Sequence, residues 1–266
     1  MSKSRPVGRV AYDNTGRVVI VTGGTGGIGQ AICDIFVETR ATVVCVDLNE
    51  PTEPSTSSNF YFRRTDVSQE RDCQQTVAWV IEKFGGVDIL VNNAAIQPVA
   101  SFVPLHKLDG DLWRKILDVN ISGYTYMAKY AVVQMVEQKS GVIINLASAQ
   151  AHRTAREVAA YGPTKAANLL QAKQWAIEYA RYGIRVVSIS PGAINTPLVQ
   201  ASLEMQGGEA ELANRHPLGR IGQPAEIAYA ALWLASDHAS FVTATDLAVD
   251  GGLDAFGAFA DPYPMS

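Results

Sequence analysis

The sequence lacks the features that mark several large classes of protein. No apolar run approaches the ~18 residues that a membrane-spanning helix needs. Residues 1–16 are polar and lack the apolar stretch of a secretory signal peptide. The net charge is only −4, and lysine and arginine are dispersed along the chain. We therefore expect a cytoplasmic protein with neither a nucleic-acid nor a membrane partner.

Cysteine and histidine are also scarce, with three cysteines and four histidines in 266 residues. Cys33, Cys45 and Cys73 are odd in number and show no CxxC spacing, which indicates reduced thiols. The histidines are scattered singly, so no metal site is expected. No stretch of the chain is typical of a linker. With 47% hydrophobic residues, the length fits one α/β domain with tails over 1–16 and 253–266.

The clearest positive pattern is a glycine-rich turn after a short apolar run at Val18–Val21. The run is rich in β-branched residues, which is typical of a strand buried on both faces of a parallel sheet. Apolar residues at helical spacing follow the turn. Glycine lets the backbone approach a phosphate closely, and a helix N-terminus offers free N–H groups. The pattern predicts a phosphate site, and a glycine turn without a ligand is the alternative.

A second buried strand over 41–47 ends in a carboxylate, Asp47, which lies 24 positions after Gly23. An acidic residue at this distance is typical of contact with the adenosine ribose. A carboxylate there repels a 2′-phosphate by roughly 4 kcal/mol at about 4 Å and an effective dielectric near 20. We therefore expect NAD to be favoured over NADP. The alternative is a surface aspartate at a strand end.

Further strands are expected at 60–62, 87–91, 142–146, 185–189 and 246–252, alternating with helices at 69–84, 111–138, 161–182 and 223–234. This alternation predicts a doubly wound parallel sheet. Asn120 lies inside one long helix, where asparagine competes for backbone hydrogen bonds. It marks either a local kink or a functional position.

Tyr161 and Lys165 are four residues apart at the start of a helix, because Pro163 is accommodated only in a first turn. Oxidation of an alcohol needs a base for the hydroxyl proton. A free tyrosine has a pKa of ~10, and lowering it by ~3 units takes about 4 kcal/mol. One ammonium at about 4 Å supplies about that much, so Lys165 is expected to lower the pKa of Tyr161.

The order and spacing of these motifs resemble the short-chain dehydrogenase/reductase family over residues 18–252. The glycine turn fits TGxxxGxG, and Tyr161 with Lys165 fits YxxxK. The resemblance implies a single-domain, Rossmann-type, doubly wound fold of about seven parallel strands in the order 3-2-1-4-5-6-7, flanked by helices. It also implies that Tyr161 is the acid/base and Lys165 its electrostatic partner and a ribose ligand. Ser148 would bind the substrate oxygen, and Asn120 would hold a relay water.

The resemblance implies cofactor contacts at the glycine turn, at three strand ends and in the catalytic helix. These are Gly23, Gly26, Gly27, Ile28, Gly29, Asp47, Leu48, Asp66, Val67, Asn93, Ala94, Ala95, Tyr161, Lys165, Pro191, Gly192, Ile194 and Thr196. Ala95 and Ala244 stand where the family usually has glycine, and Asp66 could instead cap the next helix.

Most relatives of this size are tetramers, so a homotetramer is expected. Two long helices carry small and apolar residues suited to packing against another copy: Tyr126, Met127, Ala131, Val132 and Met135 on one, and Ala166, Ala167, Leu170 and Ala176 on the other.

The substrate is expected to lie under a mobile loop over about 197–217, which contains two adjacent glycines. Polar residues after the strand ends favour a sugar, polyol or sugar acid, oxidised at a secondary alcohol or hemiacetal. The candidates are Gln97, Ser148, Gln150, His152 and Arg153, and the alternative is that they are solvated. Three other functions stay open: a dehydrogenase of apolar or acyl hydroxy substrates, a non-catalytic NAD-binding sensor, and a nucleotide-sugar epimerase or dehydratase.

Overall fold

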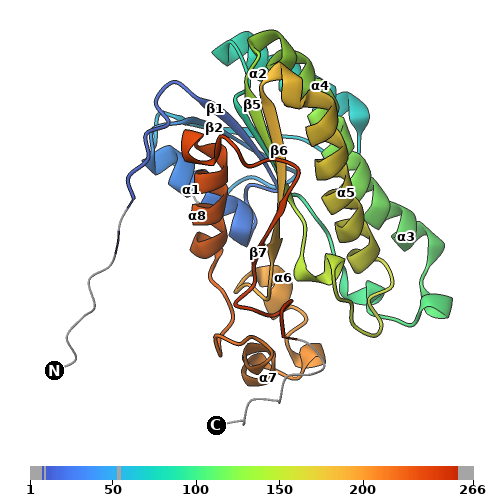
Figure 1. Ribbon diagram of the computed structural model, residues 1–266. Coiled ribbons are helices and arrows are strands. Elements are labelled where there is room, and N and C mark those ends of the chain that lie inside the picture. Colours follow the sequence, from blue (N-terminus) through green and yellow to red (C-terminus); the bar gives the residue numbers. More distant parts are fainter. Residues whose placement is uncertain (1–7, 9, 53–54, 257–266) are drawn as a thin grey trace.

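Seven parallel strands form one sheet at the centre of the computed structural model (Figure 1). In chain order they are β1 (Val18–Thr22), β2 (Thr42–Asp47), β3 (Phe60–Arg64), β4 (Ile89–Asn92), β5 (Gly141–Leu146), β6 (Ile184–Pro191) and β7 (Asp246–Val249). They lie side by side in the order β3-β2-β1-β4-β5-β6-β7, which confirms the expected fold and strand order. The structure describes residues 8, 10–52 and 55–256, so parts of both expected tails lie outside it.

Helices cover both faces of the sheet (Figure 1). On one face lie α1 (Gly27–Glu38) and α8 (Pro224–Ala235); on the other lie α2 (Glu70–Phe84), α4 (Gly123–Gln138) and α5 (Tyr161–Tyr179). The side chains of β1 alternate between the two layers. Val19 and Val21 pack with α1, whereas Val18 and Ile20 pack in the opposite core. Two buried faces explain why inner strands such as β1 are continuously apolar.

The strand order reverses beside β1, which pairs with β2 on one side and with β4 on the other. In a doubly wound sheet the connections after two such strands leave in opposite directions, and a crevice opens at their carboxyl ends. The glycine-rich turn follows β1, and the segment 93–96 follows β4. The topology therefore brings these two segments to one edge of the sheet.

The helix expected over 111–138 is interrupted in its middle. It consists of α3 (Gly110–Leu117), a π-helical turn over Asp118–Ser122, and α4. Asn120 lies in the π turn and is fully buried. Such widened turns are frequent at functional sites. The structure therefore shows the local distortion expected at Asn120, and Asp118 and Val119 of the same turn line the cleft described below.

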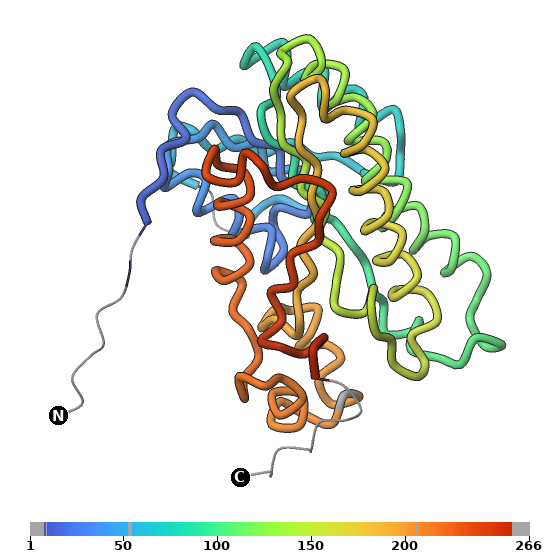
Figure 2. Tube along the Cα trace, viewed as in Figure 1, coloured from blue at the N-terminus to red at the C-terminus, as the bar shows by residue number. Residues whose placement is uncertain are grey.

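The segment expected as a covering loop contains two short helices, α6 (Pro197–Gln200) and α7 (Glu209–Asn214). Figure 2 shows this orange segment near the end of the described chain, which is drawn in red. The main chain of Leu218 donates a hydrogen bond to the carbonyl of Gly251, so the two segments are joined. In the described part of the chain, no helix combines the length and apolarity needed to cross a membrane.

Candidate active site

A cleft of about 810 Å³ opens at the carboxyl ends of the strands, beside the point where the strand order reverses. Every residue expected to contact the cofactor lines it, as does Ser148. The cofactor set comprises Gly23, Gly26, Gly27, Ile28, Gly29, Asp47, Leu48, Asp66, Val67, Asn93, Ala94, Ala95, Tyr161, Lys165, Pro191, Gly192, Ile194 and Thr196. The volume falls within the range of small-molecule and cofactor sites.

The glycine turn is shaped by contacts that exclude larger residues. Gly23 has a φ of +62°, and a Cβ there would lie 2.8 Å from the Cα of Ala94. A Cβ on Gly29 would lie 2.0 Å from the carbonyl oxygen of Gly23. The side-chain amide of Asn93 donates to the carbonyls of Thr22 and Gly23, at 2.9 and 3.0 Å. The turn is thus held as a compact backbone cradle before α1, which suits the pyrophosphate of a dinucleotide.

Asp47 ends β2 at one side of the cleft, with its carboxylate held in place by main-chain donors. The backbone N–H groups of Thr25 and Asn49 each donate to it at 3.2 Å. Leu48 follows, 49% exposed, on the cleft wall. Both positions fit the adenosine half of a dinucleotide, since a carboxylate can accept bonds from ribose hydroxyls. Thr25 and Asn49 still leave acceptor capacity on the carboxylate for that purpose.

Two uncertainties of the sequence are resolved nearby. Asp66 accepts hydrogen bonds from the backbone and hydroxyl of Ser68, at 3.0 and 2.7 Å. It does not cap α2, which begins at Glu70 with Gln69 as its N-cap. Ala95, which replaces a glycine of the family pattern, is not among the described residues with positive φ. An alanine is therefore accommodated there without backbone strain.

Tyr161 and Lys165 lie on one face of α5 and both reach the cleft wall. The Lys165 Nζ lies 5.6 Å from the centre of the Tyr161 ring. Burial raises the pKa of Tyr161 to about 12, partly offset by a hydrogen bond from Ser148. Burial also lowers the pKa of Lys165 to about 7. In the protein alone, desolvation therefore outweighs the expected lowering of the Tyr161 pKa by Lys165.

Asn120 is fixed by its side chain between two parts of the site. Its Oδ1 accepts from the backbone N–H of Ile96 at 2.8 Å. Its Nδ2 donates to the carbonyl of Ile96 at 3.0 Å and to the hydroxyl of Thr164 at 3.2 Å. The side chain thus joins the segment after β4 to the first turn of α5. Both of its donors are used, so a relay water would have to donate to an acceptor, either the second lone pair of Oδ1 or the main-chain carbonyl.

Two buried polar side chains that the sequence patterns did not single out lie outside the cleft lining and bond residues at or next to it. The hydroxyl of Tyr124 accepts a hydrogen bond from Lys165 Nζ at 3.1 Å. His216 donates from Nδ1 to the carbonyl of Leu212 and accepts at Nε2 from the backbone N–H of Ala193. His216 therefore ties α7 to the segment after β6. The only sequence signal that could have pointed to Tyr124 is its position, an aromatic residue four positions after Asn120.

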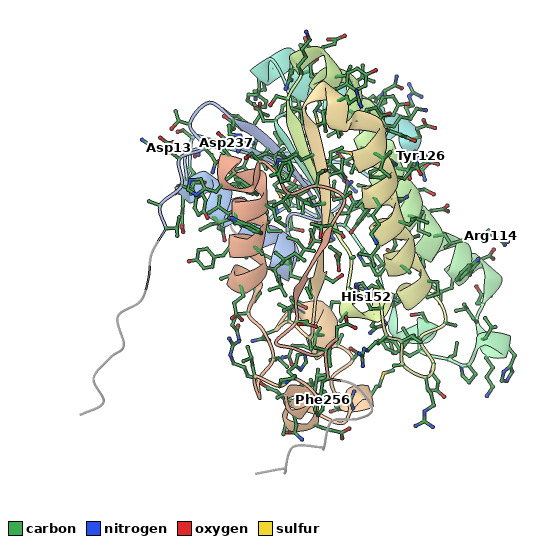
Figure 3. All side chains as sticks on the ribbon, in the orientation of Figure 1. Asp13, Arg114, Tyr126, His152, Asp237 and Phe256 are labelled. Atoms are coloured by element: carbon green, nitrogen blue, oxygen red, sulfur yellow. The ribbon has the colours of Figure 1, made fainter. Side chains whose placement is uncertain are left out.

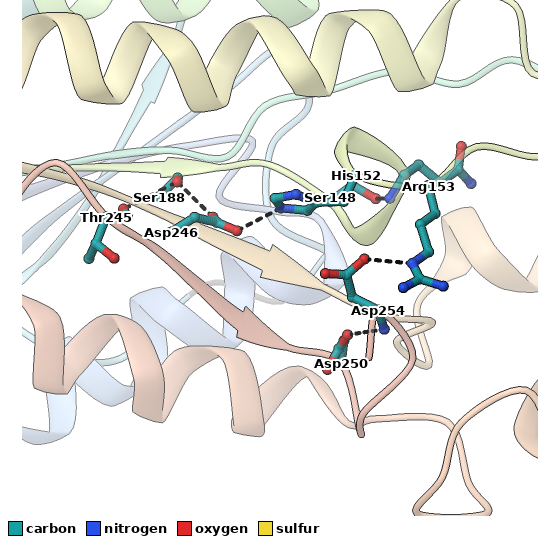
Figure 4. A network of polar contacts seen from close by, with 9 residues as sticks. Ser148, His152, Arg153, Ser188, Thr245, Asp246, Asp250 and Asp254 are labelled. Carbon is teal, nitrogen blue, oxygen red and sulfur yellow. Dashed lines mark hydrogen bonds and ion pairs between the residues drawn. The ribbon is translucent and has the colours of Figure 1, made fainter. Parts of the chain in front are cut away.

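The polar substrate candidates other than Ser148 do not line the cleft. His152 pairs with Asp246 at 2.9 Å, and Arg153 pairs with Asp254 at 3.0 Å (Figure 4). Asp246 also accepts from the Ser188 hydroxyl. Gln150 and His152 line a second cavity of about 480 Å³ under the segment 151–166. This arrangement directs His152 and Arg153 to the C-terminal part of the chain.

Several buried side-chain polar atoms have no hydrogen-bond partner among the described residues, and two of them belong to substrate candidates outside the cleft lining. They are Nε2 of Gln97 and Oε1 of Gln150. A buried amide atom without a partner is costly, so each is suited to bond an incoming polar ligand. The part of the chain that the structure describes contains no group of three or more His, Cys, Asp or Glu side chains arranged to hold a metal ion.

Comparison with known proteins agrees with this geometry. Residues 23–254 match a family described as enoyl-(acyl carrier protein) reductase. The chain is 37% identical to a 2,5-dichloro-2,5-cyclohexadiene-1,4-diol dehydrogenase of Sphingobium indicum, over 91% of this chain and 99% of the relative. It is 39% identical to a short chain dehydrogenase/reductase of Aspergillus oryzae, over 90% and 95%. The solved aldohexose dehydrogenase of Thermoplasma acidophilum superimposes with a TM-score of 0.86 and 32% identity, covering 95% of this chain and 98% of that one.

Proposed function

The chain belongs to the short-chain dehydrogenase/reductase family, and from this we propose that it is an NAD-dependent dehydrogenase that interconverts a secondary alcohol and a ketone, or a sugar hemiacetal and a lactone. The observation that carries the proposal is the convergence of Ser148, Tyr161 and Lys165 on the cleft that the glycine turn lines. A non-catalytic sensor would not need this convergence. Bound NAD would supply the hydride acceptor and a positively charged ring.

The protein's part in the reaction is to position the alcohol and move its proton. Ser148 would donate to the substrate oxygen, and Tyr161 would take the hydroxyl proton as the alcohol is oxidised. Bringing the Tyr161 pKa from about 12 to near neutrality takes roughly 7 kcal/mol. The Lys165 ammonium and the positive charge of the oxidised cofactor act in the same direction. Both are needed, because burial alone opposes ionisation.

The substrate we propose is a six-membered ring alcohol with further hydroxyl groups, such as a sugar or cyclic polyol. Two relatives are named for an aldohexose and for a cyclohexadiene diol. Gln97 directly follows Ile96 of the cleft wall and Gln150 lies two positions after Ser148, and although neither lines the cleft, their unpartnered buried amide atoms favour a substrate rich in hydroxyls over a purely apolar one. An anionic group on the substrate is less favoured than the sequence suggests, because Arg153 is already paired with Asp254.

We also propose a homotetramer, through only part of the residues that the sequence suggests on the two helices, because five of them are buried within the chain and Leu170 is exposed. Met127, Ala131, Met135 and Ala176 are fully buried within this chain's own core, and Val132 nearly so. On the same helices Val133, Leu170 and Ile177 are 59%, 68% and 75% exposed. Tyr126, labelled in Figure 3, is half-buried on α4. Light scattering at micromolar concentration tests this, and a monomeric mass would overturn it.

The experiment that tests the activity is a panel of alcohols with purified protein and NAD or NADP, followed by the near-ultraviolet absorbance of the reduced cofactor. Sugars, cyclic diols, hydroxy acids, steroids and hydroxyacyl compounds form the arms. We expect turnover with a sugar or cyclic diol. Turnover only of steroids or hydroxyacyl compounds would overturn the substrate class, and no turnover in any arm would overturn the activity.

The variant Tyr161→Phe should keep NADH binding and lose turnover by about 10²-fold or more, because the ring stays and the proton acceptor is removed. Tyr130→Phe is the matched control, since the Tyr130 hydroxyl bonds Glu70 away from the cleft. Full activity in Tyr161→Phe would eliminate Tyr161 as the acid/base.

A further inference from the structure

Tyr124 has the largest fully buried side chain among the described residues. It lies in the first turn of α4, directly after the π turn that carries Asn120. Its side chain is 1% exposed and does not line the cleft. The ring therefore lies in the core, in contact with Lys165 of α5 and with the end of β5, and any influence on the reaction has to pass through another residue.

Its hydroxyl belongs to a closed set of three hydrogen bonds. Lys165 Nζ donates to the Tyr124 hydroxyl at 3.1 Å and to the carbonyl of Leu146 at 2.7 Å. The Tyr124 hydroxyl donates in turn to the same Leu146 carbonyl at 3.0 Å. Because its proton is committed to Leu146, the hydroxyl presents a lone pair to the ammonium. The contact thus favours the charged form of Lys165.

Few other groups stabilise that charge. The titratable side chains facing Lys165 are Tyr161 on its own helix and Tyr124 on α4. The sheet offers only the Leu146 carbonyl, and no carboxylate of the described residues pairs with Lys165. Desolvation is the cause that lowers the pKa of Lys165. Burial, with a smaller contribution from Tyr161, raises the pKa of Tyr124, which therefore keeps its proton.

The geometry also orients the lysine. An ammonium has three N–H donors, and two of them are used by Tyr124 and Leu146. Lys165 itself lines the cleft, so its third donor is left for a ligand there. A phenylalanine at position 124 would fill the same space. It would offer no hydrogen-bond acceptor to the ammonium. Burying a hydroxyl costs free energy unless the hydroxyl is hydrogen-bonded, so the tyrosine is explained by its bonds to Lys165 and Leu146.

We propose that Tyr124 is a positioning residue that keeps Lys165 charged and aimed at the cleft. The proposal rests on the proposed function, in which Lys165 contacts the nicotinamide ribose and supports ionisation of Tyr161. Tyr124 acts on the reaction only through Lys165. It is therefore a determinant of the pH range over which the site works.

The test measures NADH binding by nicotinamide fluorescence between about pH 6 and 10. In the wild type, affinity should fall as Lys165 loses its proton, and Lys165→Met should abolish this dependence. Tyr124→Phe removes an acceptor from the ammonium, so the pKa of Lys165 falls. The midpoint should therefore move to lower pH by about one unit. Tyr130→Phe, on the same helix, should leave the midpoint in place.

A second readout uses the alcohol identified by the substrate panel. For alcohol oxidation, Tyr124→Phe should move the acidic limb of kcat/KM to higher pH, because a less charged Lys165 lowers the Tyr161 pKa less. A loss of activity that is equal at every pH would reflect packing alone and would overturn the proposal. Thermal unfolding checks that Tyr124→Phe is folded, as expected for a change that keeps the ring.

The binding test separates this proposal from the proposed function. NADH binding with an unmoved midpoint in Tyr124→Phe would overturn the role of Tyr124 and leave the dehydrogenase proposal standing. An equal shift in Tyr130→Phe would overturn it as well. Absence of NADH binding by the wild type would overturn the proposed function and this inference with it.

Discussion

The choice between NAD and NADP is expected to depend on one carboxylate, Asp47. Its two oxygens are fixed by the backbone N–H groups of Thr25 and Asn49, so it cannot easily turn away from a bound nucleotide. At about 4 Å and an effective dielectric near 20, repulsion of a 2′-phosphate amounts to roughly 4 kcal/mol. Asp47 is half-buried, so we take this as an upper value. The wild type should favour NADH over NADPH by about 10²- to 10³-fold.

The double variant Asp47→Ser/Leu48→Arg should reverse this preference. Removing the carboxylate ends the repulsion and costs NADH a charged hydrogen bond, worth about 1.5–3 kcal/mol or roughly 10- to 100-fold in affinity. Leu48 is 49% exposed on the cleft wall, so an arginine there can reach a phosphate without entering the core. NADPH should then bind at least as tightly as NADH.

The assay is titration of each reduced cofactor by fluorescence, at fixed ionic strength because the charge effect is screened by salt. Asp34→Ser is the control: it removes the same charge from an exposed position on α1 that does not line the cleft. The reasoning is refuted if the wild type binds NADH and NADPH equally, or if the double variant keeps the wild-type ratio.

Two further predictions concern the backbone. Ala244 has a φ of +55°, which is a strained conformation for alanine, so Ala244→Gly should raise the unfolding temperature by about 1–3 °C. The control Ala248→Gly, in β7, should lower the unfolding temperature. An unchanged or lower unfolding temperature for Ala244→Gly would contradict this reasoning. Gly29→Ala places a Cβ 2.0 Å from the carbonyl oxygen of Gly23 and should destabilise the protein by several kcal/mol. In the control Gly26→Ala, the nearest atom to the new Cβ lies at 3.4 Å, so this variant should unfold near the wild-type temperature. Similar unfolding temperatures for these two variants would show that the turn adapts.

The sheet was predictable because its inner strands, β1, β2, β4, β5 and β6, are buried on both faces. Continuous β-branched runs such as Val18–Val21 have no other stable location in a chain of this composition. The position of the cleft followed, since parallel strands place their carboxyl ends at one edge. Where an expected strand or helix is present, its observed ends differ from the predicted ones by a few residues, whereas α6 and α7 and the break between α3 and α4 were not predicted.

What the sequence could not reveal depends on contacts between distant residues. The π turn around Asn120 is stabilised by bonds to Ile96 and Thr164, which belong to other elements. The role of Tyr124 depends on where Lys165 lies after folding. His152 and Arg153 were attractive as substrate ligands because their partners, Asp246 and Asp254, lie about 100 positions away in the chain.

The segment after Ser148 is joined to β7 and to the residues that follow it (Figure 4). Homologues that are recombined to alter substrate range should therefore exchange residues 148–160 and 246–256 as one block. A crossover between the two segments would pair Asp246 and Asp254 with side chains that come from a different parent protein. Libraries that keep the two segments from a single parent should retain a larger fraction of folded, active chimeras.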